Sequence, residues 1–455
     1  LVEKRQLACD FCGERFRDLD EVPHYQRYRV LGIAGHCEKH GLFHKSPDWR
    51  DLNAMERADE LREGLRLPVE LFCVGQGDKS VQLLNRNIRC YLDLFSSRQL
   101  IFLNEVIRLL PHFDSPVRLN LALLVSTSLE FNSMLCGYKG ASTKRAGAVR
   151  HTFSHHGYSF PYTALENNPL YPRKASGTLQ KLFHSRIVRG REWSKQPVER
   201  VLYDRKHKFF PIEGERDFGE EVATAAALLD NDRRFLLRQG SSVNLPVAGG
   251  SIDAIVTDPP YYDTIQYGDL SAFFRVWLRQ FLPDAALWDY DQSTAAVGSA
   301  RSGTRDRYIH LMTSIFRESR RVLRPETGRL IFTFHHWQAR AWSALSIALH
   351  HAGFRLLNRY VVHAEHPMSV HISKMRALTH DAILVLTSDD VDRGSDWEHP
   401  LSIPKEDGFR FTEGCGTLLG WILDQRTLTD RQIDAIWKSA LSSAASADPV
   451  KRIPG

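Results

Sequence analysis

The residues best suited to chemistry form one short run, Thr257–Asp263 (TDPPYYD), which follows the apolar run Ile252–Thr257 (IDAIVT). The apolar run predicts a β-strand. In open parallel sheets ligands bind beyond the carboxyl ends of the strands, and two prolines would hold the backbone rigid there. Asp258 and a proline carbonyl can then accept hydrogen bonds from an amino group on a planar ring, with Tyr261 stacked on that ring. The alternative interpretation is an ordinary strand-ending turn with surface tyrosines.

Two pairs of metal-ligand residues lie near the amino terminus. Each pair has two residues inside it, and 24 residues separate the pairs, which are Cys9 with Cys12 and Cys37 with His40. Two such knuckles can complete a tetrahedron, and four protein ligands leave no open position, so the spacing predicts a structural zinc ion in a zinc-ribbon-like module. His36 or His44 could take the place of the fourth ligand. The alternative is four unrelated side chains in a polar loop.

Residues 137–180 are irregular and polar, and a loop of this length is usually functional or disordered. Its cations Lys144, Arg145 and Arg150, together with the aromatic residues Tyr158, Phe160 and Tyr162, favour phosphate contact and base stacking. We add His151 and Tyr262 as candidate DNA contacts. A solvated loop is the alternative. His151 and His155 would also suit a zinc hydrolase, but no glutamate is adjacent to them.

Helices and strands alternate in the carboxyl-terminal half of the chain. Strands are expected at Phe235–Leu237, Ile252–Thr257, Leu330–Phe334 and Asp381–Leu386, and helices at Glu221–Leu229, Tyr308–Leu323 and Trp342–Ala352, the last ending at Gly353. This alternation predicts an α/β fold, with a parallel sheet and helices on both faces. Earlier in the chain, residues 85–136 have a helical pattern. The expected domains are a zinc module (1–60), a helical segment with its loop (61–215), the α/β domain (216–392) and a helical tail (393–455).

The composition of the 455-residue chain is that of an ordinary globular protein, with 43% hydrophobic and 25% charged residues. No apolar run is long enough for a transmembrane helix. The net charge of +6 permits a nucleic-acid partner without requiring one. Seven cysteines are too few for a disulfide scaffold, so we expect a reducing, cytoplasmic location. The chain begins with leucine, and we expect a fragment or a processed product.

Asp258–Tyr261 resembles motif IV of the S-adenosylmethionine-dependent DNA amino-methyltransferases, which methylate N6 of adenine or N4 of cytosine. The context is similar to the large bacterial DNA methylases that carry the DUF1156 domain, over most of residues 90–388. The segments that carry the resemblance are Val149–Ser154 (VRHTFS), Leu165–Asn168 (LENN), Asp258–Asp263 (DPPYYD), Tyr267–Arg279 (YGDLSAFFRVWLR), Arg321–Pro325 (RVLRP) with Gly328, Phe332–Trp337, Trp342–Phe354 and Glu365–Ser369.

The resemblance implies a Rossmann-like methyltransferase domain at 216–392 that acts on double-stranded DNA at the nucleoid. The target base would be flipped into a pocket. Asp258 and the Pro259 carbonyl would hold its amino group, Pro260 would complete the rigid turn, and Tyr261 would stack on the base. Aspartate at the first motif position favours adenine over cytosine.

The glycine-rich turn that normally holds S-adenosylmethionine is missing from its expected place. We interpret Gly414-Cys415-Gly416 with Gly420 as a loop or helix start. The missing turn is expected upstream of Leu1 or on a partner chain, which leaves Gly240, Ser241 and Asp258 as cofactor contacts. An ordinary turn at 240–242 is the alternative. The rival function is a catalytically incomplete DNA-binding or scaffold subunit of a methylase or defence complex. Asp269 and Arg275 are expected to pack near the site.

Overall fold

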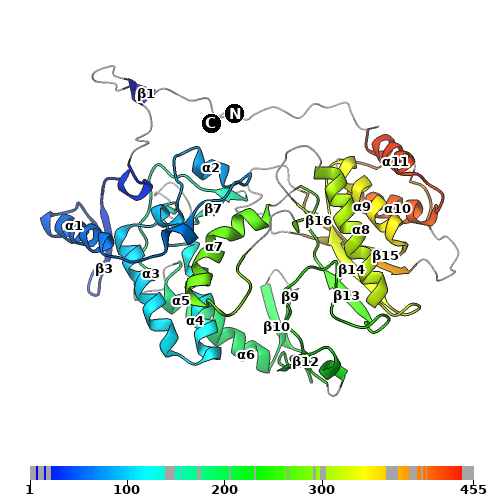
Figure 1. Ribbon diagram of the computed structural model, residues 1–455, viewed down its shortest axis with the longest axis horizontal. Helices are drawn as coiled ribbons and strands as arrows, with labels where there is room; N and C mark the ends of the chain where they lie inside the picture. Colours follow the sequence, from blue (N-terminus) through cyan, green and yellow to red (C-terminus); the bar gives the residue numbers. More distant parts are fainter. Residues whose placement is uncertain are drawn as a thin grey trace. The chain divides into compact units, whose positions relative to one another are not determined.

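The computed structural model divides the chain into two compact units, and the chain passes between them three times (Figure 1). The first unit contains residues 1–219 and 268–290, and the second contains residues 220–267 and 291–455. The structure describes residues 7–8, 15–16, 22–138, 149–154, 156–171, 176–203, 206–229, 232–263, 266–289, 294–297, 304–364, 378–388, 397–400, 403–405 and 407–442.

The first unit is mainly helical, with short two-stranded sheets. Its elements are β1 (Leu7–Ala8), β2 (Arg15–Phe16), η1 (His24–Gln26), β3 (Ile33–Cys37), β4 (Gly41–Lys45), α1 (Trp49–Glu63), η2 (Val69–Phe72), α2 (Val81–Leu84), η3 (Tyr91–Leu94), α3 (Ser97–Leu109), η4 (Leu110–His112), α4 (Ser115–Leu129), β5 (Gly137–Tyr138), β6 (Val149–Arg150), β7 (Phe153–Ser154), β8 (Gly157–Tyr158), α5 (Leu179–Leu182), the π-helical η5 (Phe183–Val188), α6 (Arg189–Lys195), β9 (Val198–Tyr203), β10 (Lys206–Pro211) and α7 (Tyr267–Phe281).

Helix α7 supplies much of the core of the first unit. Phe273 and Trp277 are fully buried, and their rings contact Phe95 at centroid distances of 5.8 and 5.2 Å. The Asp269 carboxylate accepts hydrogen bonds from the backbone N–H groups of Lys79 (2.6 Å) and Ser80 (2.9 Å). A buried carboxylate needs such donors. Asp269 therefore fixes the 77–80 turn, as a helix cap supplied by a distant part of the chain.

Arg275, which the sequence places near the site together with Asp269, donates to the carbonyl of Trp288 at 2.7 Å. Both side chains thus have partners inside the first unit. These contacts indicate that the two side chains support α7 and the loop that follows it.

The second unit is built on a four-stranded sheet in the order β13-β14-β16-β15. Its elements are β11 (Glu220–Glu221), η6 (Ala226–Leu229), β12 (Arg234–Phe235), β13 (Ala254–Thr257), α8 (Thr304–Val322), β14 (Arg329–Phe334), α9 (Ala339–Ala352), β15 (Phe354–His363), β16 (His380–Ser388), α10 (Gly408–Asp424) and α11 (Asp430–Ser442).

Three strands of this sheet share one direction. β13 pairs with β14 in parallel, while β16 is antiparallel to both β14 and β15. β13, β14 and β15 therefore run the same way, and β16 returns between the last two. The expectation of a parallel sheet is correct for the first pair and wrong for β16. The reason is connectivity: β16 follows β15 without a helix among the described residues, and a direct return gives antiparallel pairing.

One face of the sheet is buried against α8 and α9. Phe332 of β14 stacks on Phe316 of α8 at 5.7 Å, and Phe334 meets Trp342 of α9 edge-on at 4.9 Å. Buried and half-buried residues alternate along β14, as expected for a strand with one core face. Gly353 ends α9 with φ of 73°, a left-handed conformation that favours glycine. The predicted strands at 252–257, 330–334 and 381–386 and the helices at 308–323 and 342–352 are confirmed.

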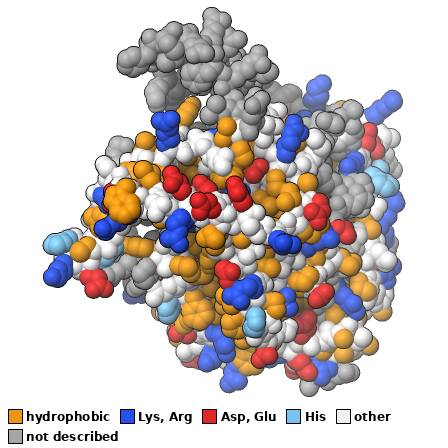
Figure 2. Space-filling view, turned by 60° about the vertical axis from the view of Figure 1, so that its left-hand side comes forward, with side chains coloured by type: hydrophobic (Ala, Val, Ile, Leu, Met, Phe, Trp, Pro, Cys, Tyr) orange, Lys and Arg blue, Asp and Glu red, His pale blue; other side chains and the backbone are white. Residues whose placement is uncertain are grey.

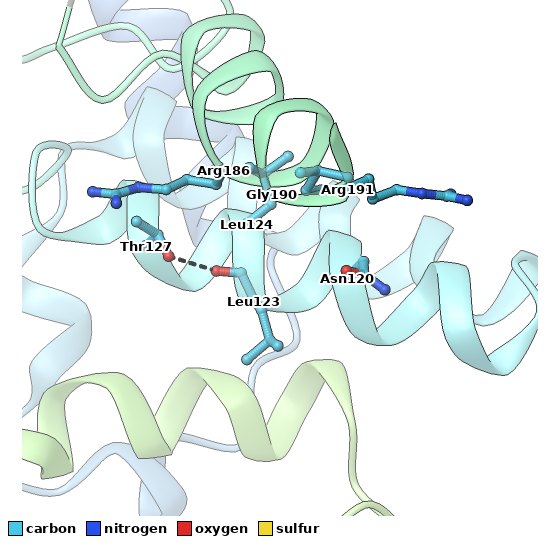
Figure 3. Close-up of a pocket in the computed structure, with 8 residues that line it drawn as sticks. Asn120, Leu123, Leu124, Thr127, Arg186, Gly190 and Arg191 are labelled. Atoms are coloured by element: carbon cyan, nitrogen blue, oxygen red, sulfur yellow. Dashed lines mark hydrogen bonds between the residues drawn. The ribbon is translucent and has the colours of Figure 1, made fainter. Parts of the chain in front are cut away.

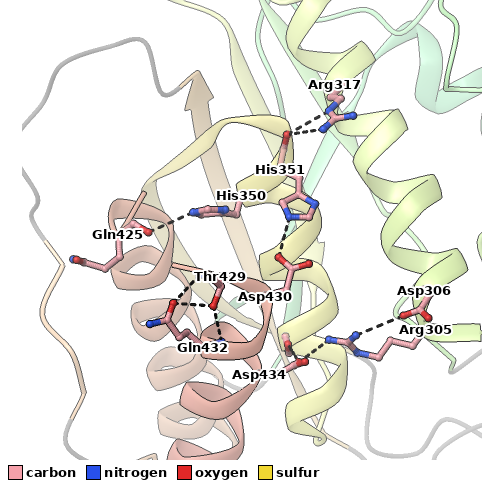
Figure 4. A network of polar contacts seen from close by, with 11 residues as sticks. Arg305, Asp306, Arg317, His350, His351, Gln425, Thr429, Asp430, Gln432 and Asp434 are labelled. Carbon is pink, nitrogen blue, oxygen red and sulfur yellow. Dashed lines mark hydrogen bonds and ion pairs between the residues drawn. The ribbon is translucent and has the colours of Figure 1, made fainter. Parts of the chain in front are cut away.

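The residues expected to form a helical tail are part of the second unit. Leu418, Ile433 and Trp437 of α10 and α11 are fully buried in the same core as the sheet. Polar contacts fix α11 to its neighbours (Figure 4): Asp434 accepts from Arg305 at 2.6 Å, and Asp430 pairs with His351 at 2.9 Å. The division into units thus differs from the predicted boundaries at 216 and 393.

The sequence predicts a helix over residues 221–229, and this prediction is wrong. Only Ala226–Leu229 forms a single 3-10 turn, and Glu221 belongs to the short strand β11. Alanine content favours a helix weakly, and here the segment has no buried residue to hold a longer one. The strand expected at 235–237 is also shorter, since β12 ends at Phe235.

The face of the molecule shown in Figure 2 carries basic, acidic and hydrophobic side chains that are interspersed with one another. None of the described helices is both long and apolar enough to cross a membrane. The overall charge does not indicate a charged binding surface. Such a surface must therefore be identified from the side chains of a particular segment.

Candidate functional site

The Asp258–Asp263 turn begins where β13 ends, as predicted. Asp258 is exposed and Pro259 is buried. The Pro260 carbonyl accepts hydrogen bonds from the Tyr262 backbone N–H (2.9 Å) and from the Tyr308 hydroxyl (3.0 Å). Tyr262 has φ of 65°, a left-handed conformation that is uncommon for a bulky residue. Such strained positions concentrate at functional sites, and here the two bonds to Pro260 hold the strain in place.

A chain of hydroxyl groups orients the Asp258 carboxylate. The Tyr261 hydroxyl donates to Thr333 Oγ1 at 2.7 Å, and Thr333 Oγ1 donates to Asp258 Oδ1 at 2.5 Å. The register explains this contact: Thr257 is the partner of Phe332, so the next residue on each parallel strand is again a neighbour. Thr333 therefore links the two candidate catalytic side chains.

The Tyr261 ring packs against the last residue of β14 and the residue that follows it. Its centroid is 5.3 Å from that of Phe334 and 4.9 Å from that of His335. Burial raises the pKa of the Tyr261 hydroxyl well above its usual range, and the Asp258 charge adds to that effect. The hydroxyl is therefore a neutral donor at physiological pH. His335 is in turn held by an ion pair with Asp381 of β16.

A second cluster stabilises the far end of the turn. Asp263 accepts from Arg340 Nη2 at 2.7 Å, and its other oxygen lies 3.2 Å from His336 Nε2. His336 Nδ1 accepts from the Gln338 backbone N–H at 3.0 Å. These contacts assign the ring proton to Nε2, which then donates to Asp263. Burial lowers the pKa of His336, so the neutral form prevails.

Tyr262 is a predicted DNA contact, and its position requires a correction. Only 5% of the residue is exposed, and its ring packs edge-on against Tyr308 at 5.2 Å. The guanidinium of Arg340 lies 5.6 Å from the ring centroid. The left-handed backbone turns this side chain into the core, where it supports the turn.

The predicted cofactor contacts at Gly240 and Ser241 form a local turn. Ser241 Oγ accepts from the Val243 backbone N–H at 3.4 Å, and no atom lies within 4 Å of the place where a Gly240 Cβ would stand. Among the described residues these two have no hydrogen bond to the Asp258 turn. An ordinary turn accounts for their contacts.

The glycines near residue 415 lie inside α10, so neither a loop nor a helix start is correct. A Cβ at Gly416 would stand 2.6 Å from Arg359 Cδ, and one at Gly420 would stand 2.5 Å from the Trp397 ring. A side chain at Gly420 would force the Trp397 ring to shift, and one at Gly416 would displace the Arg359 side chain. These residues let α10 pack tightly against its neighbours, and they do not form a phosphate- or ribose-binding turn.

Half of the predicted zinc site lies within the described residues. Cys37 ends β3 and His40 precedes β4, and Cys37 Sγ is 3.4 Å from His40 Nδ1. Cys9 and Cys12 lie outside the described residues. Within the part of the chain that is described, no group of three potential ligands gathers around one point. The nearby His44 ring is 3.3 Å from the Tyr138 hydroxyl.

The predicted DNA contacts of the 137–180 loop are only partly described. Lys144 and Arg145 lie outside the described residues, as does His155. Arg150 is exposed on β6. His151 forms an ion pair with Glu130 at 2.7 Å, and its ring lies 4.5 Å from that of Phe131. This pairing gives His151 a role within the first unit.

Sequence reasoning missed the residues that support the Asp258 turn: Thr333, Asp263, His335, His336, Arg340 and Tyr308. Thr333 carried a usable signal, because it is the polar residue in an otherwise apolar strand run (LIFTF). A polar side chain at the carboxyl end of the strand beside β13 belongs to the same edge of the sheet. His335 and His336 follow it after one further residue, Phe334.

The chain matches no known protein family and no curated protein. Its function must therefore be inferred from the site itself.

Proposed function

We propose that this chain acts in methyl transfer to an exocyclic amino group of a DNA base, with adenine N6 favoured over cytosine N4. The observation that carries the proposal is the exposed Asp258 carboxylate at the carboxyl end of β13, oriented by the Thr333 hydroxyl. A carboxylate held in one direction is suited to accept hydrogen bonds from an amino group and to turn its lone pair toward an electrophile. S-adenosylmethionine would supply the methyl group.

Each residue of the turn has a separate role in this proposal. Asp258 and the Pro259 carbonyl hold the amino group, while the Pro260 carbonyl is occupied by two internal bonds and keeps the turn rigid. Tyr261 offers part of its ring to a flipped base, because its hydroxyl end is anchored on Thr333. Asp263, His336 and Arg340 stabilise the end of the turn, outside the reacting groups.

The described residues fit the amino group better than they fit the cofactor. Among the described residues Gly240 and Ser241 have no hydrogen bond to the Asp258 turn, and the α10 glycines are used in packing. We therefore assign no step to bound S-adenosylmethionine. We propose that the binding site for S-adenosylmethionine is completed by a glycine-rich segment outside this sequence, upstream or on a partner chain.

Transfer of labelled methyl from S-adenosylmethionine to duplex DNA tests the proposal, with the DNA digested to nucleosides. Label is expected on N6-methyladenine when the wild type is assayed together with the segment or partner chain that completes the cofactor site. Asp258→Ala should abolish it, and Asp258→Asn should reduce it strongly, because an amide places a donor where an acceptor is needed. Asp253→Ala is the matched control, since Asp253 is an exposed aspartate of the same unit paired with Arg324. Undiminished turnover by Asp258→Ala would refute the assignment.

A second candidate is a catalytically incomplete DNA-binding or scaffold subunit. The edge of β13 favours it: among the described residues β13 pairs only with β14, and Val256 is 75% exposed. A parallel strand is normally covered on both faces, so a further segment would cover the exposed Val256 here. Calorimetric titration with S-adenosylmethionine separates the two candidates. Saturable binding to this chain, alone or together with the segment that completes the cofactor site, supports the enzyme, and absence of binding in both cases together with DNA binding supports the subunit.

We also propose that Cys37 and His40 hold a structural zinc ion with Cys9 and Cys12. The observation in favour is the 3.4 Å approach of Cys37 Sγ to His40 Nδ1 at the β3–β4 turn. Metal analysis should find one zinc ion per chain, lost in Cys37→Ser and retained in Cys73→Ser. Equal zinc content in the two variants would refute this site.

A further inference from the structure

A groove lies on the first unit, between α4 and the continuous helix formed by α5, η5 and α6 (Figure 3). Its volume is about 340 Å³. The lining residues are Asn120, Leu123, Leu124 and Thr127 of α4, facing Arg186, Ile187, Gly190 and Arg191. The α4 residues recur every three or four positions, so they form one face of that helix.

The groove is open because of two local features. No heavy atom lies within 4 Å of the place where a Gly190 Cβ would stand, so the missing side chain leaves space. The π-helical turns of η5 (Phe183–Val188) change the spacing of side chains just before it. π-Helical turns are rare and often occur at functional sites. The groove is thus lined by both apolar and polar side chains, and these side chains do not fill it.

The helix that forms one wall of the groove is strongly basic. From Leu179 to Lys195 it carries five lysines and arginines against one glutamate. All five cations are exposed, and none has an ion pair among the described residues; they are Lys181, Arg186, Arg189, Arg191 and Lys195. In Figure 3 the side chains of Arg186 and Arg191 extend in opposite directions from the two ends of the groove. Within the described part of the chain these charges have no acidic partner, so they are available to an external anion.

Exposed aromatic rings accompany the cations. Phe183 and Trp193, on the helix itself, are 40% and 43% exposed. Trp193 Nε1 donates to the Val198 carbonyl at 3.3 Å, which ties the end of the helix to the start of β9. Rings beside available cations suit a nucleic acid, which offers phosphates and bases together. An acidic peptide would satisfy the charges and leave the rings in water.

We infer that this surface, the helix 179–195 with its groove against α4, is a binding site for the phosphate backbone of duplex DNA, with Arg186 and Arg191 as its principal contacts. The choice of DNA as the nucleic acid rests on the proposed function. The inference adds a contact surface to the 137–180 loop residues. Phosphate contacts position a duplex without reading its sequence, so this site would add affinity for DNA and no preference for a particular sequence.

Fluorescence anisotropy of a labelled duplex, titrated with the full chain at several salt concentrations, tests the inference. The logarithm of affinity falls with the logarithm of salt by about 0.9 for each phosphate contact. Arg186→Ala/Arg191→Ala should lower this slope by about 1.8 and weaken binding about tenfold or more at low salt. Arg57→Ala/Arg66→Ala is the matched control, since both are exposed arginines of the same unit and the change in charge is the same. The control variant should keep the wild-type slope.

Two outcomes would overturn the inference. In the first, the Arg186/Arg191 variant keeps the wild-type slope and affinity while its circular dichroism shows a folded chain. In the second, both double variants lose the same amount, which would mean that general charge and no particular surface attracts DNA. An acidic peptide that binds the wild type and not the variant, with DNA affinity unchanged, belongs to the first outcome.

The test is independent of methyl transfer, because anisotropy needs neither cofactor nor turnover. Wild-type methylation with unchanged binding by the variant would refute this surface and leave the proposed function intact. Site-dependent binding without methylation by any preparation would refute the proposed function and leave the surface.

Discussion

The hydroxyl chain from Tyr261 through Thr333 to Asp258 predicts a measurable coupling between two side chains. Thr333→Val keeps the shape of the residue and removes both bonds. It leaves the half-buried Tyr261 hydroxyl without its acceptor, which costs about 1–3 kcal/mol. Tyr261→Phe removes only the 2.7 Å bond and leaves Thr333 bonded to Asp258, so its cost should be about 0.5–1.5 kcal/mol. The double variant should then cost little more than Thr333→Val alone.

The measurement is a double-mutant cycle on the free energy of unfolding in urea. Hydrogen exchange of the β14 amides follows the second unit separately from the first. The expected coupling energy is about 0.5–1.5 kcal/mol, and Thr333→Ser, which keeps the hydroxyl, is the control. Additivity within about 0.3 kcal/mol would refute the hydroxyl chain. In that case the Tyr261 hydroxyl would not hold Thr333, and the orientation of Asp258 would rest on its bond with Thr333 alone.

Three further predictions concern the fold. Burial, together with two neighbouring arginine charges, lowers the pKa of His24 from 6.5 to about 4. The unfolded chain therefore takes up this proton first as the pH falls, so the first unit should lose about 3 kcal/mol of unfolding free energy between pH 6.5 and 4, and His24→Gln should flatten that loss in urea titrations. Gly77→Ala should destabilise the first unit by about 1–3 kcal/mol, because its Cβ would stand 2.4 Å from the Asp269 carboxyl carbon, whereas Gly75→Ala, with nothing within 4 Å, should be nearly neutral in the same denaturation assay. Gly420→Ala should lower the melting temperature although alanine favours helices, and a rise would mean that this glycine is not needed for packing.

The elements around the site were predictable because their signals are local. The apolar run before Asp258, the alternation in LIFTF and the glycine after Ala352 each reflect a short-range rule, and each gave the correct element. The direction of β16 was not predictable in this way. A buried strand has the same apolar pattern whether it runs parallel or antiparallel, so the pattern alone does not give its direction.

The failures at the site have a common physical origin in tertiary contacts. Tyr262 has an ordinary surface context in the sequence, and only the left-handed turn of its backbone buries it. Gly416 and Gly420 look like breakers of secondary structure, yet inside the helix they leave room for the Arg359 side chain and the Trp397 ring. Asp269 and Asp258 are equally plausible catalytic acids by type. The Asp269 carboxylate accepts hydrogen bonds from backbone N–H groups 189 and 190 residues away in the chain, whereas the Asp258 carboxylate is exposed.

Because the chain passes back and forth between the two units, part of the second unit is synthesised before the first unit is complete. Domains usually fold as units, the amino-terminal one first, as the ribosome releases them. Here the first unit needs Phe273 and Trp277 of α7, and the sheet strand β13 is made before them. A nascent chain that ends at residue 219 would therefore hold an unfilled apolar core until α7 is released. That interval is when the chain would depend most on a chaperone, and expressing a piece that stops short of residue 290 would make the dependence permanent.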